Sequence, residues 1–222
     1  MIRLEQIGKN YLMGKRELPV LRGIDLYIEK GEMVAIMGAS GSGKTTLLNV
    51  IGCLDKPTSG SYQLEGREVS RLSNRELAII RGQKIGFIFQ TFNLLPYLSA
   101  LSNVELGLKY ANGGLNFSAR EALNRVGLTD RIKHRPTELS GGEQQRVAIA
   151  RAIVKKPPLI LADEPTGNLD SHSGAEIISI LTALHAEQGI TLVIVTHDLG
   201  IAHHCQRIIN LKDGMVMAEE TV

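Results

Sequence analysis

The chain alternates between short, almost uninterrupted apolar runs and segments in which apolar residues recur at helical spacing. Apolar runs of this length are typical of strands that are covered on both faces, as in a parallel sheet. Helical segments between such strands are the connections that a parallel sheet requires. The pattern therefore predicts an α/β fold with a mainly parallel sheet. Its four buried strands are predicted at residues 33–37, 85–89, 159–162 and 191–196.

Alternation of apolar and polar residues predicts a second set of strands at the start of the chain. Residues 2–10 and 20–28 form an antiparallel pair, joined by a turn around Met13 and Gly14. We also expect a strand at 61–64, a closing hairpin of 207–212 with 215–219, and helices at 44–52, 73–81, 173–188 and 198–204.

The pattern changes between residues 91 and 156, where no convincing strand is found. Helical periods occur instead at 102–110, 118–126 and 140–154. We therefore expect a single domain over residues 1–222. Its α/β core comprises residues 1–90 and 157–222, and a helical subdomain is inserted at about 91–156.

A glycine-rich stretch separates the strand at 33–37 from the helix that follows it. It reads Gly38-Ala39-Ser40-Gly41-Ser42-Gly43-Lys44-Thr45-Thr46. Strand, glycine-rich turn and helix is the context of a phosphate-binding loop, in which backbone N–H groups and the helix dipole hold an anion. Lys44 would contact the β- and γ-phosphates, and the Thr45 hydroxyl would bind Mg²⁺. A plain glycine-rich connector would need neither side chain. The candidate nucleotide-binding residues here are Gly38, Ser40, Gly41, Ser42, Gly43, Lys44, Thr45 and Thr46.

Two carboxylates follow the buried strand at 159–162. Asp163 would hold Mg²⁺, and Glu164 would polarise the attacking water. Neighbouring strand side chains point to opposite faces, so both carboxylates serve one site only if the chain turns there. Pro165 disfavours helix at Glu164 and so favours such a turn. A solvated acidic strand end is the alternative, which the phosphate loop disfavours.

A second glycine motif begins the helix at 140–154: Leu139-Ser140-Gly141-Gly142-Glu143-Gln144-Gln145-Arg146. Ser140 and Glu143 fit a capping box, which would explain a helix start but not the two glycines. Glycines at a helix N-terminus permit the close approach of a phosphate. The motif therefore indicates a second phosphate contact.

Composition narrows the class of protein further. The net charge of +2 arises from 25 basic and 23 acidic residues that are spread along the chain, so nucleic acid is not expected as a partner. No apolar run approaches the ~20 residues that span a bilayer, and the start has no apolar signal stretch. Cys53 and Cys205 have no metal-type spacing, and the His203-His204-Cys205 run lacks a fourth ligand. We expect a soluble intracellular protein with reduced thiols.

These motifs occur in the order of the ATP-binding-cassette (ABC) ATPase subunits, which the chain resembles over essentially its whole length. The further motif residues are Gln90, Asn168-Leu169-Asp170 and His197. The phosphate-loop (P-loop) NTPase core with an inserted helical lobe is the fold that this resemblance implies. Within the family, the chain is similar to the lipoprotein-releasing (LolD) and macrolide-exporter (MacB) subgroup. The segments that carry this likeness are 51–55, 87–90, 92–96, 134–138 and 165–170.

The resemblance implies a head-to-tail homodimer with two Mg²⁺-bound ATP molecules at its interface. The phosphate loop of one subunit would face Ser140, Gly141, Gly142 and Asp170 of the other. Gln90 would sense Mg²⁺ and the γ-phosphate. His197 would contact the γ-phosphate, or serve as a hydrogen-bonded surface histidine. Tyr11 matches the adenine-stacking aromatic, with a packing or surface tyrosine as the alternative. Residues 92–98 lie where family members meet the membrane partner, or form lobe core.

The expected activity is ATP hydrolysis that drives a separate membrane permease of the MacB or LolC–LolE type. The chain would lie at the cytoplasmic face of the inner membrane, held there through the permease. A regulatory module that signals through a membrane protein without moving cargo is the alternative. A chromosome-maintenance ATPase would need long coiled-coil arms, and the sequence contains no sustained heptads.

Overall fold

The computed structural model describes residues 1–14, 16–109 and 118–222. Residue 110, the last of the predicted helical period at 102–110, lies outside the described residues. The chain forms two compact units. The first contains Met1–Arg81 and Thr191–Val222, and the second contains Gly82–Ile190.

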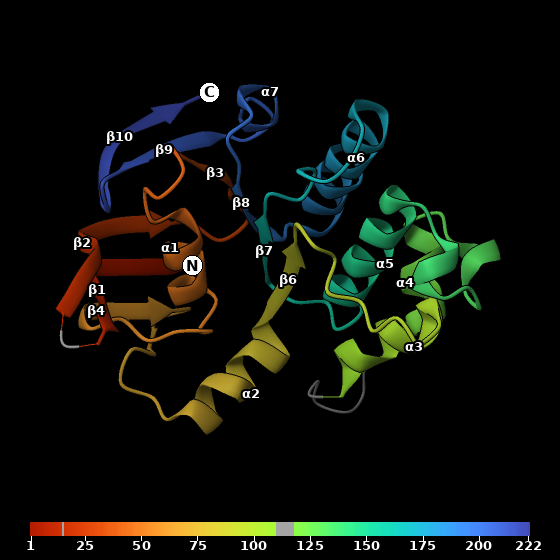
Figure 1. Cartoon of the computed structure of the whole chain (residues 1–222), viewed down its shortest axis with the longest axis horizontal. Helices are drawn as coiled ribbons and strands as arrows, with labels where there is room; N and C mark the ends of the chain where they lie inside the picture. The colour runs from red at the N-terminus through yellow and green to blue at the C-terminus, as the bar shows by residue number, and fades with distance from the viewer. Residues whose placement is uncertain (15, 110–117) are drawn as a thin grey trace. The chain divides into compact units, whose positions relative to one another are not determined.

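The predicted antiparallel strands form a sheet in the first unit (Figure 1), with the order β2-β1-β4-β5. β1 pairs with β2 from Ile2↔Ile28 to Met13↔Arg16, so both strands extend further toward the turn than the sequence predicts. The short strand β5 was not predicted. The bounds are β1 (Ile2–Met13), β2 (Arg16–Ile28), β4 (Ser59–Leu64) and β5 (Arg67–Glu68).

Four further strands of this unit are ordered β10-β9-β3-β8. β3 runs parallel to both β8 and β9, and every residue of β3 and β8 is buried, as their apolar sequences predict. β9 and β10 form the predicted closing hairpin. The bounds are β3 (Met33–Met37), β8 (Thr191–Val195), β9 (Arg207–Lys212) and β10 (Met215–Thr221), with helices α1 (Lys44–Ile51) and α7 (Leu199–Ala202).

In the second unit, β6 (Ile85–Phe89) and β7 (Leu159–Asp163) are parallel neighbours. Helix α2 (Asn74–Lys84), most of which belongs to the first unit, precedes β6 in the chain. The described residues between 91 and 156 contain helices and turns but no strand, as the sequence predicts. The helices of this unit are α3 (Ala100–Glu105), α4 (Ala119–Arg125), α5 (Gly141–Ile153) and α6 (Ser171–Gln188), with short 3₁₀ turns at 106–108, 129–131 and 136–138.

The start of α2 and the end of α1 show how local sequence sets the helix bounds. Ser73 and Glu76 exchange hydrogen bonds at the start of α2, as the sequence predicts. Helix α1 ends at Ile51, and Gly52 caps it, as predicted, but Gly52 has φ −74°. Cys53 takes the left-handed conformation instead, with φ +55°, because the next two backbone N–H groups fold back onto the Asn49 carbonyl.

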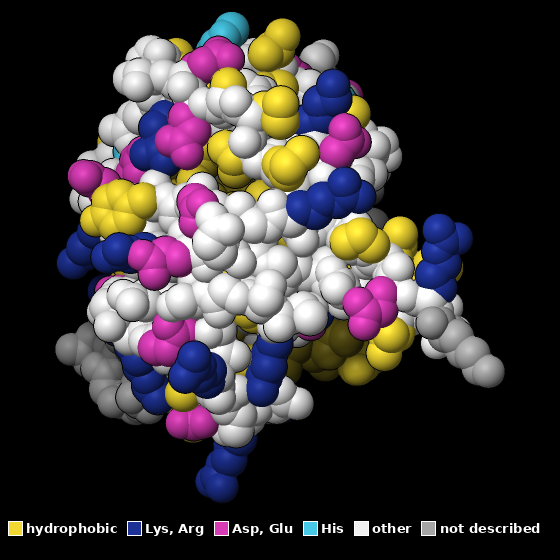
Figure 2. Space-filling model, turned by 90° about the vertical axis from the view of Figure 1, so that its left-hand side faces the viewer, with side chains coloured by type: hydrophobic (Ala, Val, Ile, Leu, Met, Phe, Trp, Pro, Cys, Tyr) yellow, Lys and Arg dark blue, Asp and Glu magenta, His cyan; other side chains and the backbone are white. Residues whose placement is uncertain are grey.

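Charges of both signs are interspersed on the face drawn in Figure 2, with hydrophobic side chains among them. This distribution agrees with the near balance of 25 basic and 23 acidic residues. Among the described residues, no helix is both long enough and apolar enough to cross a bilayer.

Candidate functional site

The glycine-rich loop is a tight turn that only glycine can form at its two ends. At Gly38, φ is +153° and a Cβ would lie 2.1 Å from the Leu211 carbonyl oxygen. At Gly43, φ is +104° and a Cβ would lie 3.0 Å from the Leu21 side chain. Backbone therefore packs against backbone around the loop, which leaves its N–H groups to line an anion site.

Helix α1 begins directly after this loop. Its N-cap is Gly43, no side chain caps it, and no acidic residue lies in its first turn. The positive end of the helix therefore keeps unpaired N–H groups for an anionic ligand. Lys44 Nζ donates hydrogen bonds to the carbonyl oxygens of Gly38 (2.7 Å) and Ala39 (3.0 Å), which holds the ammonium group over the loop.

Strand register brings His197 to the same edge of the sheet as the loop. β3 and β8 are parallel neighbours in which Ile36 pairs with Val195, so Gly38 and His197 both follow at the carboxyl edge. Ligands of open α/β sheets bind at this edge. The His197 side chain is exposed there, while Thr196 beside it is buried.

Tyr11 lies beside the same loop. Its hydroxyl donates to Asp55 Oδ2 at 3.0 Å. Burial and this hydrogen bond raise the pKa of Tyr11, and a hydrogen bond from the Thr46 side chain opposes the rise. Tyr11, Thr46, Lys44 and His197 are thus all held in the first unit.

The second unit brings together the predicted Gln90 and the carboxylates. Phe89 pairs with Asp163 at the ends of the parallel strands β6 and β7. Gln90 and Glu164 are the next residues of the two strands, so they follow the same end of this pair. Glu164 has φ +46°, which provides the turn that two adjacent carboxylates need. The predicted turn is present at Glu164, but its backbone is left-handed and not in the extended conformation that a following proline favours.

A hydrogen-bond network holds the end of β6 in place. The Asn168 side chain donates to the Gln90 backbone carbonyl at 2.9 Å. Gln145, a fully buried residue of α5, donates from Nε2 to the carbonyls of Phe89 (3.3 Å) and Pro165 (2.6 Å). Gln145 therefore connects α5 to the two strand ends that carry Gln90 and Glu164.

Helix α5 begins at the glycine motif with the predicted capping box. Ser140 Oγ accepts from the Glu143 backbone N–H at 3.2 Å, and the Glu143 carboxylate accepts from the Ser140 N–H at 2.8 Å. Hydrogen bonds from Ser140 lower the pKa of Glu143. The capping box therefore fixes Ser140 at the start of α5, directly before the two glycines.

The two glycines of this motif also have a packing role that the sequence did not reveal. A Cβ on Gly142 would lie 3.0 Å from Ser173 Oγ, and one on Gly141 would lie 3.3 Å from Leu169. The absence of both side chains therefore lets the loop before α6, and its first turn, approach α5.

Asp170 is the N-cap of α6. Its carboxylate accepts from the Ser173 backbone N–H at 3.0 Å and from the Ser173 hydroxyl at 2.7 Å. These hydrogen bonds lower the pKa of Asp170. The side chain is nevertheless exposed.

Comparison with known proteins decides the family. The family model described as ABC transporter matches residues 21–167, which is more than half of the chain. The chain belongs to the ABC transporter family. It is an ABC-type ATPase, as its motifs predict, and the α/β P-loop NTPase fold is confirmed by the same comparisons.

Relatives that are about 50% identical in sequence support the assignment of this chain to the MacB-like subgroup. The chain is 53% identical over 221 residues to the macrolide export ATP-binding/permease protein MacB of Bdellovibrio bacteriovorus, covering 99% of this chain and 34% of that protein. It therefore spans about a third of the length of this relative. It is 52% identical to the uncharacterized ABC transporter ATP-binding protein YknY of Bacillus subtilis, covering 98% and 95% of the two chains.

Solved ABC cassettes share the fold of this chain. A dimeric, post-hydrolysis structure of the ATP-binding cassette MJ0796 bound to ADP and Pi superposes with a TM-score of 0.92. Its sequence is 47% identical, and the match covers 100% of this chain and 98% of that one.

The predicted metal ligands have the chemistry that Mg²⁺ prefers. Thr45, Gln90 and Asp163 offer a hydroxyl, an amide oxygen and a carboxylate, all hard oxygen donors. Mg²⁺ in nucleotide sites is bound by few protein groups together with substrate phosphates. Among the described residues, no group of three or more His, Cys, Asp or Glu side chains could hold a metal ion by itself.

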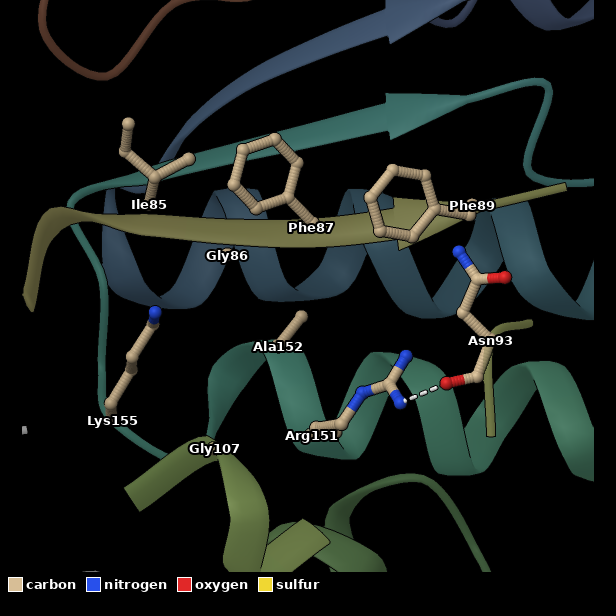
Figure 3. A pocket seen from close by; sticks show the side chains of 9 residues that line it. All are labelled: Ile85, Gly86, Phe87, Phe89, Asn93, Gly107, Arg151, Ala152 and Lys155. Carbon is tan, nitrogen blue, oxygen red and sulfur yellow. Dashed lines mark hydrogen bonds between the residues drawn. The ribbon is translucent and has the colours of Figure 1, made fainter. Parts of the chain in front are cut away.

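The second unit of this ABC ATPase also carries a basic pocket of about 280 Å³ (Figure 3). The rings of Phe87 and Phe89 are stacked, with centroids 5.6 Å apart. Arg151 donates to the Phe92 (2.8 Å) and Asn93 (2.5 Å) carbonyls, and burial lowers the pKa of Lys155 to about 8. None of the lining residues is acidic.

Several functional contacts were not predicted from the sequence. The sequence indicated Gln145 only as a member of the glycine motif at 139–146. It indicated Asn168 only as a member of a motif that resembles the family. Lys9 and Asp55, which contact Tyr11, were not considered as site residues. Their signal is tertiary, because each of these contacts joins residues at least 20 positions apart in the sequence.

Proposed function

We propose that two copies of this chain close around two ATP molecules, with each ATP bound by the phosphate loop of one copy and the Ser140–Gly142 helix start of the other. The glycine-only geometry of the loop is the observation that carries this proposal. It is supported by 47% identity to MJ0796, which forms a dimer bound to ADP and Pi. One copy of each motif per chain suits a symmetric pair with two equivalent composite sites.

Within each site, we assign Gly38 and the N–H groups at the start of α1 to the phosphates, and Lys44 to the β- and γ-phosphates. Tyr11 stacks on the adenine. His197 contacts the γ-phosphate from the first unit. The partner subunit's helix start adds the N–H groups of its glycine motif, and the exposed Asp170 carboxylate of the partner subunit lies across the interface.

Hydrolysis in this scheme depends on the carboxylates of the second unit. Thr45, Gln90 and Asp163 are the residues that would hold Mg²⁺, whose charge would offset that of the phosphates. Glu164 orients and polarises the attacking water. Positioning and electrostatic stabilisation dominate phosphoryl transfer, so the left-handed turn at Glu164 matters because it sets the direction of that carboxylate.

The membrane partner is a permease of the MacB or LolC–LolE type, and this chain lies against it at the cytoplasmic face of the inner membrane. Similarity over 99% of this chain to MacB proteins favours the macrolide-export type over lipoprotein release. Residues 92–98 and the pocket beside them would receive the permease. None of residues 92–98 is buried, and Tyr97 is 67% exposed, which disfavours a role as lobe core. The region at about 91–156 acts as the helical subdomain.

The Glu164→Gln variant tests this proposal. It keeps the size and shape of the side chain but replaces the carboxylate that polarises water with a neutral amide. We expect retained ATP binding, turnover at least about 100-fold slower and an ATP-dependent dimer in light scattering after size exclusion. Glu187→Gln, on α6 and outside the site, should behave as the unchanged protein. Fast hydrolysis by Glu164→Gln, or a monomer at saturating ATP, would contradict the proposal.

A further inference from the structure

The Tyr11 side chain is held by charged groups that the ATPase motifs do not include. Lys9 and Tyr11 lie two residues apart on β1, so both project from the same face of the strand. Lys9 is only 8% exposed, although lysine is rarely buried unless it is paired. A buried lysine next to a proposed base-stacking ring therefore needs an explanation.

Asp55 provides the counter-charge. Lys9 Nζ donates to Asp55 Oδ1 at 2.6 Å and to the Lys56 carbonyl at 2.8 Å. The other carboxylate oxygen of Asp55 accepts from the Tyr11 hydroxyl at 3.0 Å. Burial raises the pKa of Asp55, but hydrogen bonds from Lys9, from Tyr11 and from the Lys56 backbone outweigh it, so the pKa lies below its usual value.

The Lys9 ammonium also lies 4.9 Å from the centroid of the Tyr11 ring. This distance is within the range of a cation–π contact, in which the cation covers one face of the ring. A base that stacks on Tyr11 would therefore use the opposite face. The ring is fixed at two points, by its hydroxyl and by one face.

Asp55 itself is anchored to the helix that follows the phosphate loop. The backbone N–H groups of Leu54 and Asp55 bond to the Asn49 carbonyl of α1 at 2.9 and 3.2 Å. Asp55 thus connects the end of α1 to β1. The phosphate loop begins α1, so the position of the ring is set relative to the phosphates through one helix.

We propose that Asp55 and Lys9 are positioning residues that fix the Tyr11 ring for stacking on the nucleotide base. This inference rests on the proposed ATP-binding function. Because the Tyr11 hydroxyl is already bonded to Asp55, the ring selects its ligand by stacking. Asp55 and Lys9 then contribute to the affinity for nucleotides and not to the affinity for the phosphates alone.

The test compares ATP with inorganic tripolyphosphate, which has the phosphates but no base. Equilibrium binding of both ligands, with Mg²⁺, is measured for the unchanged protein and for Tyr11→Phe, Asp55→Ala and Lys9→Met. We expect each variant to bind ATP about 3- to 10-fold more weakly and to bind tripolyphosphate within about twofold of the unchanged protein, given the size of base–aromatic stacking. In steady-state assays, KM for ATP should rise while kcat stays constant.

Tyr11→Phe and Asp55→Ala break the same hydrogen bond. The double variant should therefore bind ATP no more weakly than Asp55→Ala alone. Asp25→Ala is the matched control, since Asp25 accepts hydrogen bonds from Gln6 in the same sheet but does not contact Tyr11. It should leave both affinities unchanged.

Two results would overturn the inference. Equal weakening of ATP and tripolyphosphate would show that Asp55 and Lys9 only support the fold of the loop. Unchanged ATP affinity in all three variants would show that the ring needs no such anchor. If the unchanged protein bound neither ligand, the ATP-binding proposal would fail as well, so the two failures are distinguishable.

Discussion

At the scale of single residues, the site depends on a few positions with an unusual backbone conformation. Gly38 cannot carry a Cβ, because the Leu211 carbonyl lies 2.1 Å from where that atom would be. Glu164 has a left-handed φ although it is not a glycine. Strained positions of this kind persist where the surrounding structure holds them, and they collect at functional sites.

Lys44→Ala is expected to lose nucleotide affinity. The ammonium group is held over the loop by the Gly38 and Ala39 carbonyls, so its removal takes away the positive charge nearest the proposed phosphates. We expect ATP affinity to fall at least about tenfold, equivalent to ~1.4 kcal/mol. Equilibrium titration with a fluorescent ATP analogue measures this. Lys30→Ala, outside the loop, serves as the control, and unchanged affinity in Lys44→Ala would contradict the loop assignment.

Lys155 is expected to titrate near pH 8. Burial lowers its pKa from 10.5 to about 8, so the folded chain releases this proton at a lower pH than the unfolded chain does. Between about pH 8 and 10 the unfolded state binds more protons at this site, and the free energy of unfolding should rise with pH. Competitive amine labelling, read by mass spectrometry, should show Lys155 reacting at a lower pH than the exposed Lys156. Equal profiles for the two lysines would contradict the prediction.

At the scale of elements, α5 has two functions. Ser140 and the two glycines lie at its start. Gln145, in its interior, donates hydrogen bonds to the chain at the ends of β6 and β7. A shift of this helix on contact with a phosphate would thus be transmitted to Gln90 and Glu164. The helix start and the two strand ends are connected by hydrogen bonds within one unit.

Gln145→Leu tests this connection. The substitution leaves the Phe89 and Pro165 carbonyls without their donor, so the strand ends that carry Gln90 and Glu164 lose a shared anchor. We expect kcat to fall about tenfold, ATP affinity to change little, and the Mg²⁺ concentration needed for half-maximal activity to rise. Gln144→Leu is a matched control, because the Gln144 side chain donates to the nearby Leu139 carbonyl rather than to the strand ends. Equal effects of the two variants would argue against a specific role for Gln145.

At the scale of the whole molecule, the proposed site is complete only when two chains meet. The candidate residues fall into two groups, one in each compact unit. A head-to-tail pair would place the phosphate loop of each chain opposite the α5 start of the other. This arrangement makes a prediction that a site within one chain does not make.

Mixing two inactive variants should restore activity. Lys44→Ala removes the loop contact, and Ser140→Arg blocks the helix start. In a mixed dimer one site carries both defects, while the other combines an intact loop with an intact helix start. We expect ATPase activity in the mixture and nearly none in either variant alone. Mixing Lys44→Ala with Glu164→Gln should not restore activity, because both residues serve the site of their own chain. No recovery in the first mixture would contradict a shared site.

The sequence determined most of the fold, because its signals are local. The apolar runs predicted β3, β6, β7 and β8, since strands covered on both faces consist mostly of apolar residues. The capping boxes of α2 and α5 were predicted because the partners are three residues apart. The family motifs predicted the ABC ATPase, since each motif is defined by residue types at fixed spacings that can be read directly from the sequence.

Only the tertiary structure decided which distant side chains support the site. Asp55 and Lys9 are 46 residues apart, and Gln145 and Pro165 are 20 apart, so no periodicity in the sequence pairs them. The packing role of Gly142 likewise depends on Ser173 from another helix. Such contacts arise when helices and strands pack, and their energy depends on distances that the order of residues does not encode. The sequence therefore determined the chemistry of this ATPase, and the packing of its elements decided which side chains hold that chemistry in position.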